Sequence, residues 1–229
     1  MARPSSYGVK MTTIVPAKHQ PRPPYHHGDL ARALLKAADA IIEEEGLEAF
    51  TLRSCARRAG VSHAAPAHHF KDRAGLLSAY AASIFRDLTA TVQEHIAQAG
   101  NDNYARLRAT GLAYIEFALQ RPGAFRLVFR CEALAKDCPE MKEAGDACFQ
   151  VLIDVVQALM PAADQRRVLV HTTMAWSLVH GFATLWLDGN LCNALGGHCS
   201  DINTKADALA GQILALVRPA FVASATPAL

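Results

Sequence analysis

The sequence lacks the features that mark secreted and membrane-spanning proteins. Its longest apolar run, residues 181–187, is far shorter than a membrane span and is interrupted by Thr184, so we expect no segment to cross a bilayer. No apolar signal segment precedes the cysteines, which are scattered without a close pair. We therefore expect free thiols in a reduced cytoplasm at Cys55, Cys131, Cys138, Cys148, Cys192 and Cys199.

Patterns of enzyme active sites are absent as well. The chain has no nucleophile elbow, phosphate-binding loop or paired-carboxylate arrangement, so we expect no catalytic residues and no cofactor. A helical enzyme is kept as an alternative. Three residues of a glycine-rich loop, Cys192, His198 and Cys199, support another alternative, a metal- or redox-responsive regulator. Their loose spacing matches no recognised zinc pattern, so our first expectation is that the chain has no metal site.

Length and charge indicate two domains with different tasks. The 229 residues, of which 51% are hydrophobic, are enough for one small domain and one larger domain. Residues 1–80 hold eleven Lys and Arg against seven Asp and Glu, whereas the remainder holds twelve against fourteen. A basic N-terminal part is typical of a domain that meets a polyanion, and the near-neutral remainder indicates another role.

Apolar residues recur at three-to-four spacing, and no stretch alternates convincingly at period two, so we predict an all-α fold. One predicted helix carries an apolar stripe of Leu77, Tyr80, Ile84, Leu88 and Val92, and can connect two domains as a rigid lever. The predicted helices cover residues 29–46, 51–60, 62–68, 74–99, 104–119, 122–130, 139–159, 164–187 and 202–217, and a loop covers residues 188–201.

Two of these helices are short and are separated by a glycine, which is the arrangement of a helix-turn-helix. In the first, the Thr51 hydroxyl is placed to cap the helix and Gly60 to end it. In the second, Ser62 is the expected cap, and Pro66 is expected in the first turn, where a missing N–H costs little. Small residues and imidazoles on this helix suit a major groove, although an ordinary antiparallel helix pair is the alternative.

The residues that carry this pattern occur in a recognisable order. They are Thr51, Arg53, Ala56, Ala59, Gly60, Val61, Ser62, His69, Phe70 and Leu76. Their order resembles the DNA-binding domain of the tetracycline-repressor (TetR) family of bacterial regulators. Residues 25–30, together with Trp176, His180 and Gly181, resemble a subgroup with a C-terminal Trp-His-Gly signature. One departure is that a phosphate-contacting Tyr of the family, just before His-Phe, is replaced by Ala67 followed by His68.

The resemblance implies an N-terminal three-helix helix-turn-helix domain over residues 25–74. A larger helical domain over residues 75–229 would bind an effector and form a homodimer. The preceding residues 1–24 are rich in proline and basic side chains and show no apolar period, so we predict a disordered basic arm there. Such an arm is either only a tail or a segment that follows the DNA backbone or minor groove.

Specific binding of a double-stranded DNA operator needs phosphate contacts for register and base-edge contacts for sequence. The motif offers both kinds of side chain, and the matching positions of the family perform both tasks. The expected phosphate contacts are Thr51, Arg53, Lys71 and Arg73, and the expected groove contacts are Ser62, His63, Ala64, Ala67 and His68. We expect His69 to pack against the protein rather than to contact a base.

The second domain holds several aromatic residues with few polar groups among them. Such a set fits an apolar ligand cavity, and it equally fits a filled core. The candidate pocket residues are Phe85, Tyr114, Phe117, Phe125, Phe129, Phe149, Trp176 and His180. In the family such a cavity binds a small molecule that releases a dimeric repressor from its operator, and the last two long helices form a four-helix dimer interface.

Overall fold

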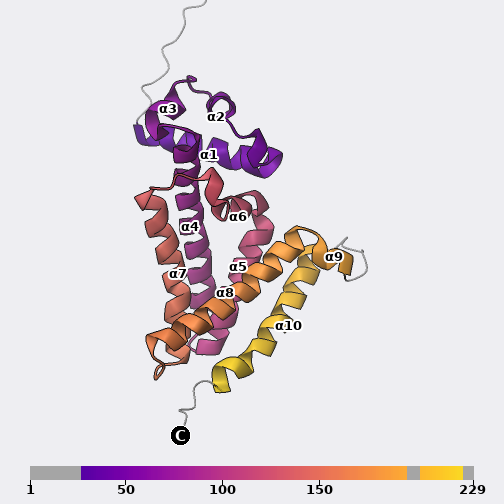
Figure 1. Ribbon diagram of the computed structural model, residues 1–229. Helices are drawn as coiled ribbons and strands as arrows, with labels where there is room; N and C mark the ends of the chain where they lie inside the picture. Colours follow the sequence, from indigo (N-terminus) through magenta and orange to yellow (C-terminus); the bar gives the residue numbers. More distant parts are fainter. Residues whose placement is uncertain (1–26, 195–201, 224–229) are drawn as a thin grey trace, which may run out of the picture.

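The computed structural model describes residues 27–194 and 202–223, and every regular element within these ranges is a helix (Figure 1). The all-α prediction is therefore confirmed for this part of the chain. The α-helices are α1 (His27–Glu45), α2 (Leu52–Ala59), α3 (Ala65–Phe70), α4 (Arg73–Gln98), α5 (Asn103–Gln120), α6 (Pro122–Val128), α7 (Pro139–Leu159), α8 (Gln165–Leu187), α9 (Asn190–Ala194) and α10 (Ile202–Ala223). Two 3-10 turns, η1 (Leu47–Ala49) and η2 (Cys131–Ala133), connect them.

Most helices begin and end close to the predicted residues, but the segment predicted as a loop contains the short helix α9. Gly189 follows α8 with a φ of 74°, and the Asn193 N–H then donates to the Gly189 carbonyl oxygen at 3.0 Å, which starts a new helical turn. α10 also continues past the predicted end, through Pro219 to Ala223.

The first three helices pack around the start of α4 and form a small head at one end of the molecule (Figure 1). α2 begins at a reciprocal cap, in which the Thr51 hydroxyl accepts the Ser54 N–H at 2.9 Å and the Ser54 hydroxyl accepts the Thr51 N–H at 2.9 Å. Gly60 ends α2 at a φ of 69°, a left-handed conformation that glycine adopts without strain. Both sequence signals for this helix are confirmed.

The next helix begins later than predicted, and the prediction that Ser62 caps it is wrong. Ser62, His63 and Ala64 form a turn instead, in which the Ala65 N–H donates to the Ser62 carbonyl oxygen at 3.1 Å. Ala64 holds the cap position without a side-chain acceptor, and Pro66 lies in the first turn as predicted, which leaves one orphan donor fewer. The turn therefore presents its side chains ahead of α3.

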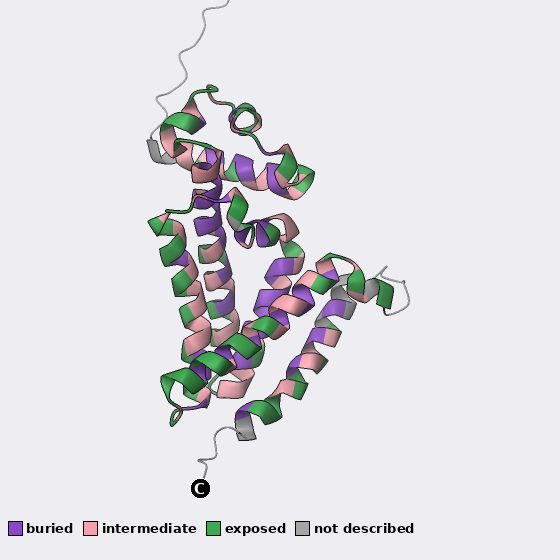
Figure 2. Ribbon diagram, viewed as in Figure 1, coloured by how far each residue is buried: buried purple, intermediate pink, exposed green. Residues whose placement is uncertain are grey.

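α4 extends from the head along the helical bundle of the second half of the chain (Figure 1). Its predicted apolar stripe is buried at every position: Leu77, Tyr80, Ile84, Leu88 and Val92. The later turns of α4 pack against α5 and α7, while its first turns pack against α1 and α3 (Figure 2). One continuous helix thus belongs to both halves of the molecule.

A cluster of polar side chains fastens the head to the bundle. Arg121, between α5 and α6, donates to the Asp39 carboxylate of α1 at 2.6 Å and to the Asp87 carboxylate of α4 at 2.8 Å. The Tyr80 hydroxyl donates to Asp39 at 2.5 Å. Burial, reinforced by Asp39, raises the pKa of Tyr80, so the hydroxyl keeps the proton that it donates.

A second contact joins α1 to α6. The Glu43 carboxylate accepts the N–H groups of Gly123 at 3.0 Å and Ala124 at 2.8 Å, in the first turn of α6, where unpaired N–H groups attract negative charge. A Cβ at Gly123 would lie 2.7 Å from the Ile42 carbonyl oxygen, so glycine permits this close approach. We refer to Asp39, Glu43, Tyr80, Asp87 and Arg121 together as the joint.

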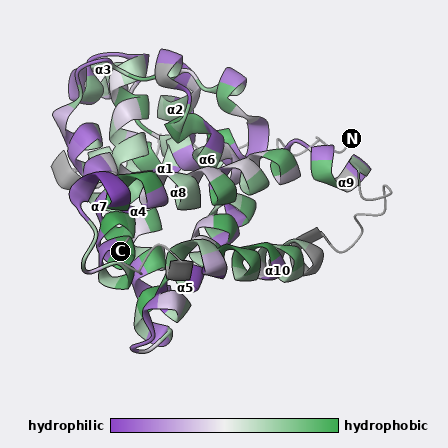
Figure 3. Cartoon of the chain, turned by 60° about the horizontal axis from the view of Figure 1, so that its bottom comes forward, coloured by the Kyte–Doolittle hydropathy of each residue, from purple (hydrophilic) through white to green (hydrophobic). Residues whose placement is uncertain are grey.

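α8 crosses the bundle and packs against α5, α7 and α10 (Figure 1). Among the described residues it is the helix that is long and apolar enough to span a membrane by length and composition, a test that the core helix of a bundle also passes. Part of its apolar surface faces outward, because Leu169, Val170, Met174 and Leu185 are exposed. α10 is apolar along much of its length as well (Figure 3), and its Leu216 is 79% exposed.

Gly75 permits α4 to begin close to the end of α3. A Cβ at this position would lie 2.1 Å from the Phe70 carbonyl oxygen, a backbone atom that cannot move alone. We predict that Gly75→Ala lowers the free energy of unfolding by about 1–3 kcal/mol. Urea denaturation followed by circular dichroism, at fixed protein concentration, measures this loss.

Gly145→Ala in α7 is the matched control. Its Cβ would meet the Phe85 ring at 3.5 Å, an ordinary contact, so stability should stay level or rise by up to about 1 kcal/mol through helix propensity. An equal loss in both variants would contradict the backbone clash.

Candidate nucleic-acid interface and ligand cavity

The five side chains predicted to enter a groove lie together at the tip of the head. Ser62, His63 and Ala64 of the turn, and Ala67 and His68 of α3, are all exposed. Residues three and four apart share one side of a helix, so Ala64, Ala67 and His68 point the same way. This surface, called the α3 face below, offers imidazole donors and acceptors for base edges and methyl groups for a thymine methyl.

Cationic side chains flank the α3 face. Arg53 and Arg57 on α2, and Lys71 just after α3, are exposed. Arg58 is compensated within the head, because its guanidinium pairs with the Glu45 carboxylate of α1 at 3.0 Å. These exposed cations lie on α2, which contacts α3, and at the end of α3. That Arg53 and Lys71 contact phosphates stays a prediction.

The predicted phosphate contacts Thr51 and Lys71 also end or begin helices. Thr51 is exposed at the N-terminus of α2, and its hydroxyl takes part in the cap. Lys71 ends α3 at a φ of 68°, an uncommon conformation for a residue with a Cβ. Its side chain projects from the end of α3 into solvent.

Arg73 departs from the predicted phosphate contact. Its Nε donates to the Phe50 carbonyl oxygen at 3.1 Å and its Nη2 to the Leu47 carbonyl oxygen at 3.2 Å. The guanidinium also lies over the Phe50 ring, 5.8 Å from its centroid. The side chain is thus used to hold η1 against α4, because the fold brings these two carbonyls within its reach.

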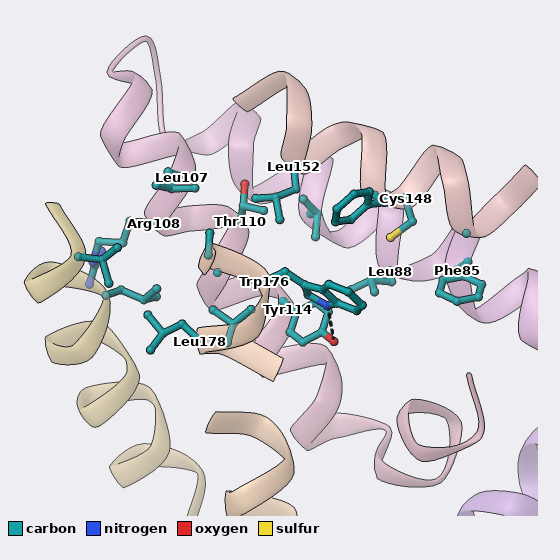
Figure 4. A pocket seen from close by; sticks show the side chains of 18 of the residues that line it. Phe85, Leu88, Leu107, Arg108, Thr110, Tyr114, Cys148, Leu152, Trp176 and Leu178 are labelled. Atoms are coloured by element: carbon teal, nitrogen blue, oxygen red, sulfur yellow. Dashed lines mark hydrogen bonds between the residues drawn. The ribbon is translucent and has the colours of Figure 1, made fainter. Parts of the chain in front are cut away.

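The bundle contains a cavity of about 370 Å³, within the size range of small-molecule sites (Figure 4). It lies among α4, α5, α7, α8 and α10. Five predicted pocket residues line it: Phe85, Tyr114, Phe129, Phe149 and Trp176.

Three other predicted pocket residues do not line this cavity and pack in the surrounding core instead. Phe117 lies beneath the Arg121 guanidinium, 5.4 Å from its ring centroid. Phe125 packs edge-on against Tyr114 at 5.6 Å between ring centroids, and His180 packs against Phe129 at 4.5 Å. Because the helices of a bundle bury more than one side, aromatic character alone did not separate cavity wall from core.

The polar atoms at the centre of the cavity bond to one another. The Trp176 Nε1–H donates to the Tyr114 hydroxyl at 3.3 Å (Figure 4), and that hydroxyl is hydrogen-bonded to His180 Nδ1 at 2.9 Å. Burial raises the pKa of Tyr114 and lowers the pKa of His180. Both groups are therefore neutral at pH 7, and the predicted contact between the Trp176 and His180 rings is confirmed at 5.8 Å between centroids.

Several lining residues were missed because the sequence criterion was aromatic content. Leu88 and Val92 belong to the α4 stripe, whose spacing gave a usable signal. Thr110 and Cys148 also line the cavity; the Thr110 hydroxyl donates to the Arg106 carbonyl oxygen at 2.9 Å, and burial raises the pKa of the Cys148 thiol. Arg108 lines the cavity as well, although nothing in the sequence around this charged residue indicated a pocket.

The structure does not describe the side chains of the alternative metal- or redox-responsive site. His198 and Cys199 fall outside the described residues, as does the predicted arm over residues 1–24, and the Cys192 side chain is likewise not among those described. The metal- or redox-responsive site and the disordered arm therefore stay predictions.

Comparisons with known proteins cover both halves of the chain. A family model described as "Bacterial regulatory proteins, tetR family" matches residues 34–80, and one described as "Tetracyclin repressor-like, C-terminal domain" matches residues 107–220. The HTH-type transcriptional regulator BetI of Yersinia pestis is 39% identical over 77 residues, and that of Burkholderia thailandensis is 42% identical over 76 residues. The matched segment is 33% of this chain and 39% of each of these relatives, so the likeness is confined to less than half of either protein.

Solved structures match over most of the chain. A protein of unknown function from Rhodococcus sp. RHA1 is 31% identical, with a TM-score of 0.68 over 87% of this chain and 97% of that one. A TetR variant from Acinetobacter baumannii AYE, in complex with minocycline, has the same fold with a TM-score of 0.57 at 14% identity, over 86% of this chain and 98% of that one. The Trp-His-Gly subgroup stays a prediction.

Substitutions of Arg73 and Lys71, the two cations that follow α3, should differ in their effect on stability. We predict that Arg73→Ala lowers the free energy of unfolding by about 1–3 kcal/mol, because the hydrogen bonds of the guanidinium to two backbone carbonyls are lost. Lys71→Ala keeps a Cβ at the same φ and removes only an exposed charge, so its stability should change by less than about 0.5 kcal/mol. Urea denaturation of both variants decides, and equal losses would contradict the structural task of Arg73.

Proposed function

Because the chain belongs to the TetR family of bacterial regulatory proteins, we propose that it is a transcriptional repressor that binds operator DNA as a homodimer and leaves it when a small molecule binds. In this proposal residues 25–74 bind the operator, and residues 75–229 bind the effector and the second copy. The protein acts in the cytoplasm, where its thiols stay reduced, and it does so without catalysis.

The observation that carries the proposal is the exposure of the α3 face. α3 and the turn before it lie at the end of the head that is away from the bundle (Figure 1), and the five side chains are exposed there. Exposed cations lie on α2, which contacts α3, and at the end of α3 itself. An ordinary helix pair would use such residues for internal packing, whereas a recognition helix leaves them free to enter a major groove. Arg53 and Lys71 then contact phosphates, while His63 and His68 contact base edges.

A second copy is required on physical grounds. One head of this size contacts few phosphates, so useful affinity needs two heads on half-sites about one helical turn apart or more. Exposed apolar side chains on α8 and α10, among them Val170, Met174 and Leu216, support these helices as the contact between copies.

Release by a ligand requires that the ligand bind the non-operator state more tightly than the operator state. The cavity touches α4, which continues into the head, and its wall residue Phe129 directly follows α6. α6 in turn is bonded to α1 through Glu43 and Arg121. A ligand that shifts α4 or α6 therefore acts on the head through the joint.

A pair of substitutions tests the division of labour on DNA. We predict that Arg53→Ala weakens binding to every DNA sequence and reduces the slope of log affinity against log salt by about one. His68→Ala should instead cost about 1–3 kcal/mol at one base-pair position and relax preference there. Gel-shift titrations use a duplex selected from a random library by the wild-type protein, and its single-base variants, at several salt concentrations; identical behaviour of the two variants would contradict the proposal.

Dimerisation is tested on the apolar surface of α8 and α10. We predict that the double variant Val170→Asp, Leu216→Asp is a monomer at concentrations where the wild type is a dimer, because the added carboxylates would be buried unpaired. Sedimentation equilibrium measures the mass. Gln93→Asp adds the same kind of charge on the exposed side of α4 and should leave the dimer intact; a monomeric wild type, or a dimeric double variant, would contradict this interface.

A further inference from the structure

The two ends of the cavity differ in charge. At one end, formed by α4 and α7, the wall consists of Phe85, Cys148 and their apolar neighbours (Figure 4). Asp146 also borders the cavity, but its carboxylate pairs with Lys142 of the same helix. At the other end, between α5 and α10, Arg108 stands at the rim (Figure 4).

Arg108 differs from Arg106 of α5 and Arg126 of α6, whose side chains are bonded to backbone carbonyls. Arg106 donates to the Gly100 carbonyl oxygen at 2.7 Å, and Arg126 donates to the Leu187 carbonyl oxygen at 2.8 Å. Among the side chains that the structure describes, by contrast, Arg108 has no ion pair or hydrogen bond. A guanidinium has five N–H donors, so this one is available to a ligand.

The surroundings of Arg108 leave room for its head group. Its Nη2 lies 3.1 Å from where a Cβ on Gly211 of α10 would be, so the absence of that side chain lets the guanidinium lie close to α10. A second cation is near, because Arg218 lies over the Tyr104 ring, 5.1 Å from its centroid, and Tyr104 lines the same end. Asp102 shares a surface hollow with Arg108, but its carboxylate accepts the Ala105 N–H at 2.6 Å as the cap of α5.

The rest of the cavity wall offers few hydrogen-bond partners to a second polar group of a ligand. The Tyr114 hydroxyl and the Trp176 indole bond to each other, and Tyr114 also bonds to His180. The remaining lining is largely aliphatic and aromatic, so a charge placed deep in the cavity would lose its hydration without gaining a partner.

We propose that the cavity binds an amphipathic monocarboxylate, with the carboxylate held by Arg108 at the α5–α10 end and the apolar body lying toward Phe85. A guanidinium presents two parallel N–H donors that match a carboxylate, and Arg218 adds positive charge at the same end. The inference rests on the proposed function only in taking the bound molecule to be the effector.

The test uses three probes that share a ten-carbon chain: decanoate, 1-decanol and decyltrimethylammonium. Isothermal titration calorimetry with the full-length protein, in the absence of DNA, measures their affinities. We expect decanoate to bind at least about tenfold more tightly than either of the others, the usual size of a charge-assisted hydrogen bond. Equal affinity for decanol, tighter binding of the cation, or no binding of decanoate would overturn the inference.

Substitutions then assign the preference to Arg108. Arg108→Gln should weaken the binding of decanoate by about tenfold or more and leave the binding of decanol unchanged. Arg108→Lys keeps the charge but loses the two parallel N–H donors, so its affinity for decanoate should lie between those of the wild type and Arg108→Gln. Arg57→Gln removes an equal charge from the head and should leave the affinities for decanoate and decanol unchanged. Unchanged decanoate affinity in Arg108→Gln, with the variant folded by circular dichroism, would overturn the assignment.

Gel-shift titrations of the selected duplex, with and without decanoate, distinguish a failure of this inference from a failure of the proposed function. If decanoate binds through Arg108 but does not lower affinity for the selected duplex, release by this ligand class fails while the carboxylate site stands. If the protein selects no duplex at all, the repressor proposal fails, and the calorimetry still decides the chemistry of the cavity.

Discussion

The arrangement of the molecule depends on one half-buried guanidinium. Arg121 lies where the bundle meets the head and bonds carboxylates from α1 and α4 at once, while Glu43 of α1 bonds the first turn of α6. Removal of either partner from such a cluster leaves charge without compensation, so the cluster favours a single relative placement of the two halves. Since α4 also runs through both halves without a break, the head cannot turn independently of the bundle.

Contacts through α6 connect the wall of the cavity with α1 of the head. Phe129 lines the cavity and packs against His180, and Phe125 of α6 packs against Tyr114. The opposite end of α6, at Gly123, is bonded to α1. A TetR-family regulator needs two arrangements of its head that ligand and operator favour differently, and a short helix bonded at one end and packed beside the cavity at the other is suited to shift between them.

Much of the fold could be predicted because its signals are local. The spacing of Leu77, Ile84 and Leu88 requires a helix with one buried side, and Thr51 offers the oxygen that caps α2. The start of α3 could not be predicted, because serine begins turns as readily as helices and Ala64 carries no capping group. The task of Arg73 depends on carbonyls brought near by folding, and the separation of Phe117, Phe125 and His180 from the cavity depends on which neighbours surround each helix.

The central claim is that the α3 face docks on DNA while the joint holds it in place. Hydrogen–deuterium exchange of the full-length protein, with and without a duplex that it selects from a random library, measures this most directly. The account predicts slower amide exchange over residues 51–71 on addition of the duplex, with α8 and α10 unchanged. Protection confined to the bundle, or no protection in the head at saturating duplex, would contradict it.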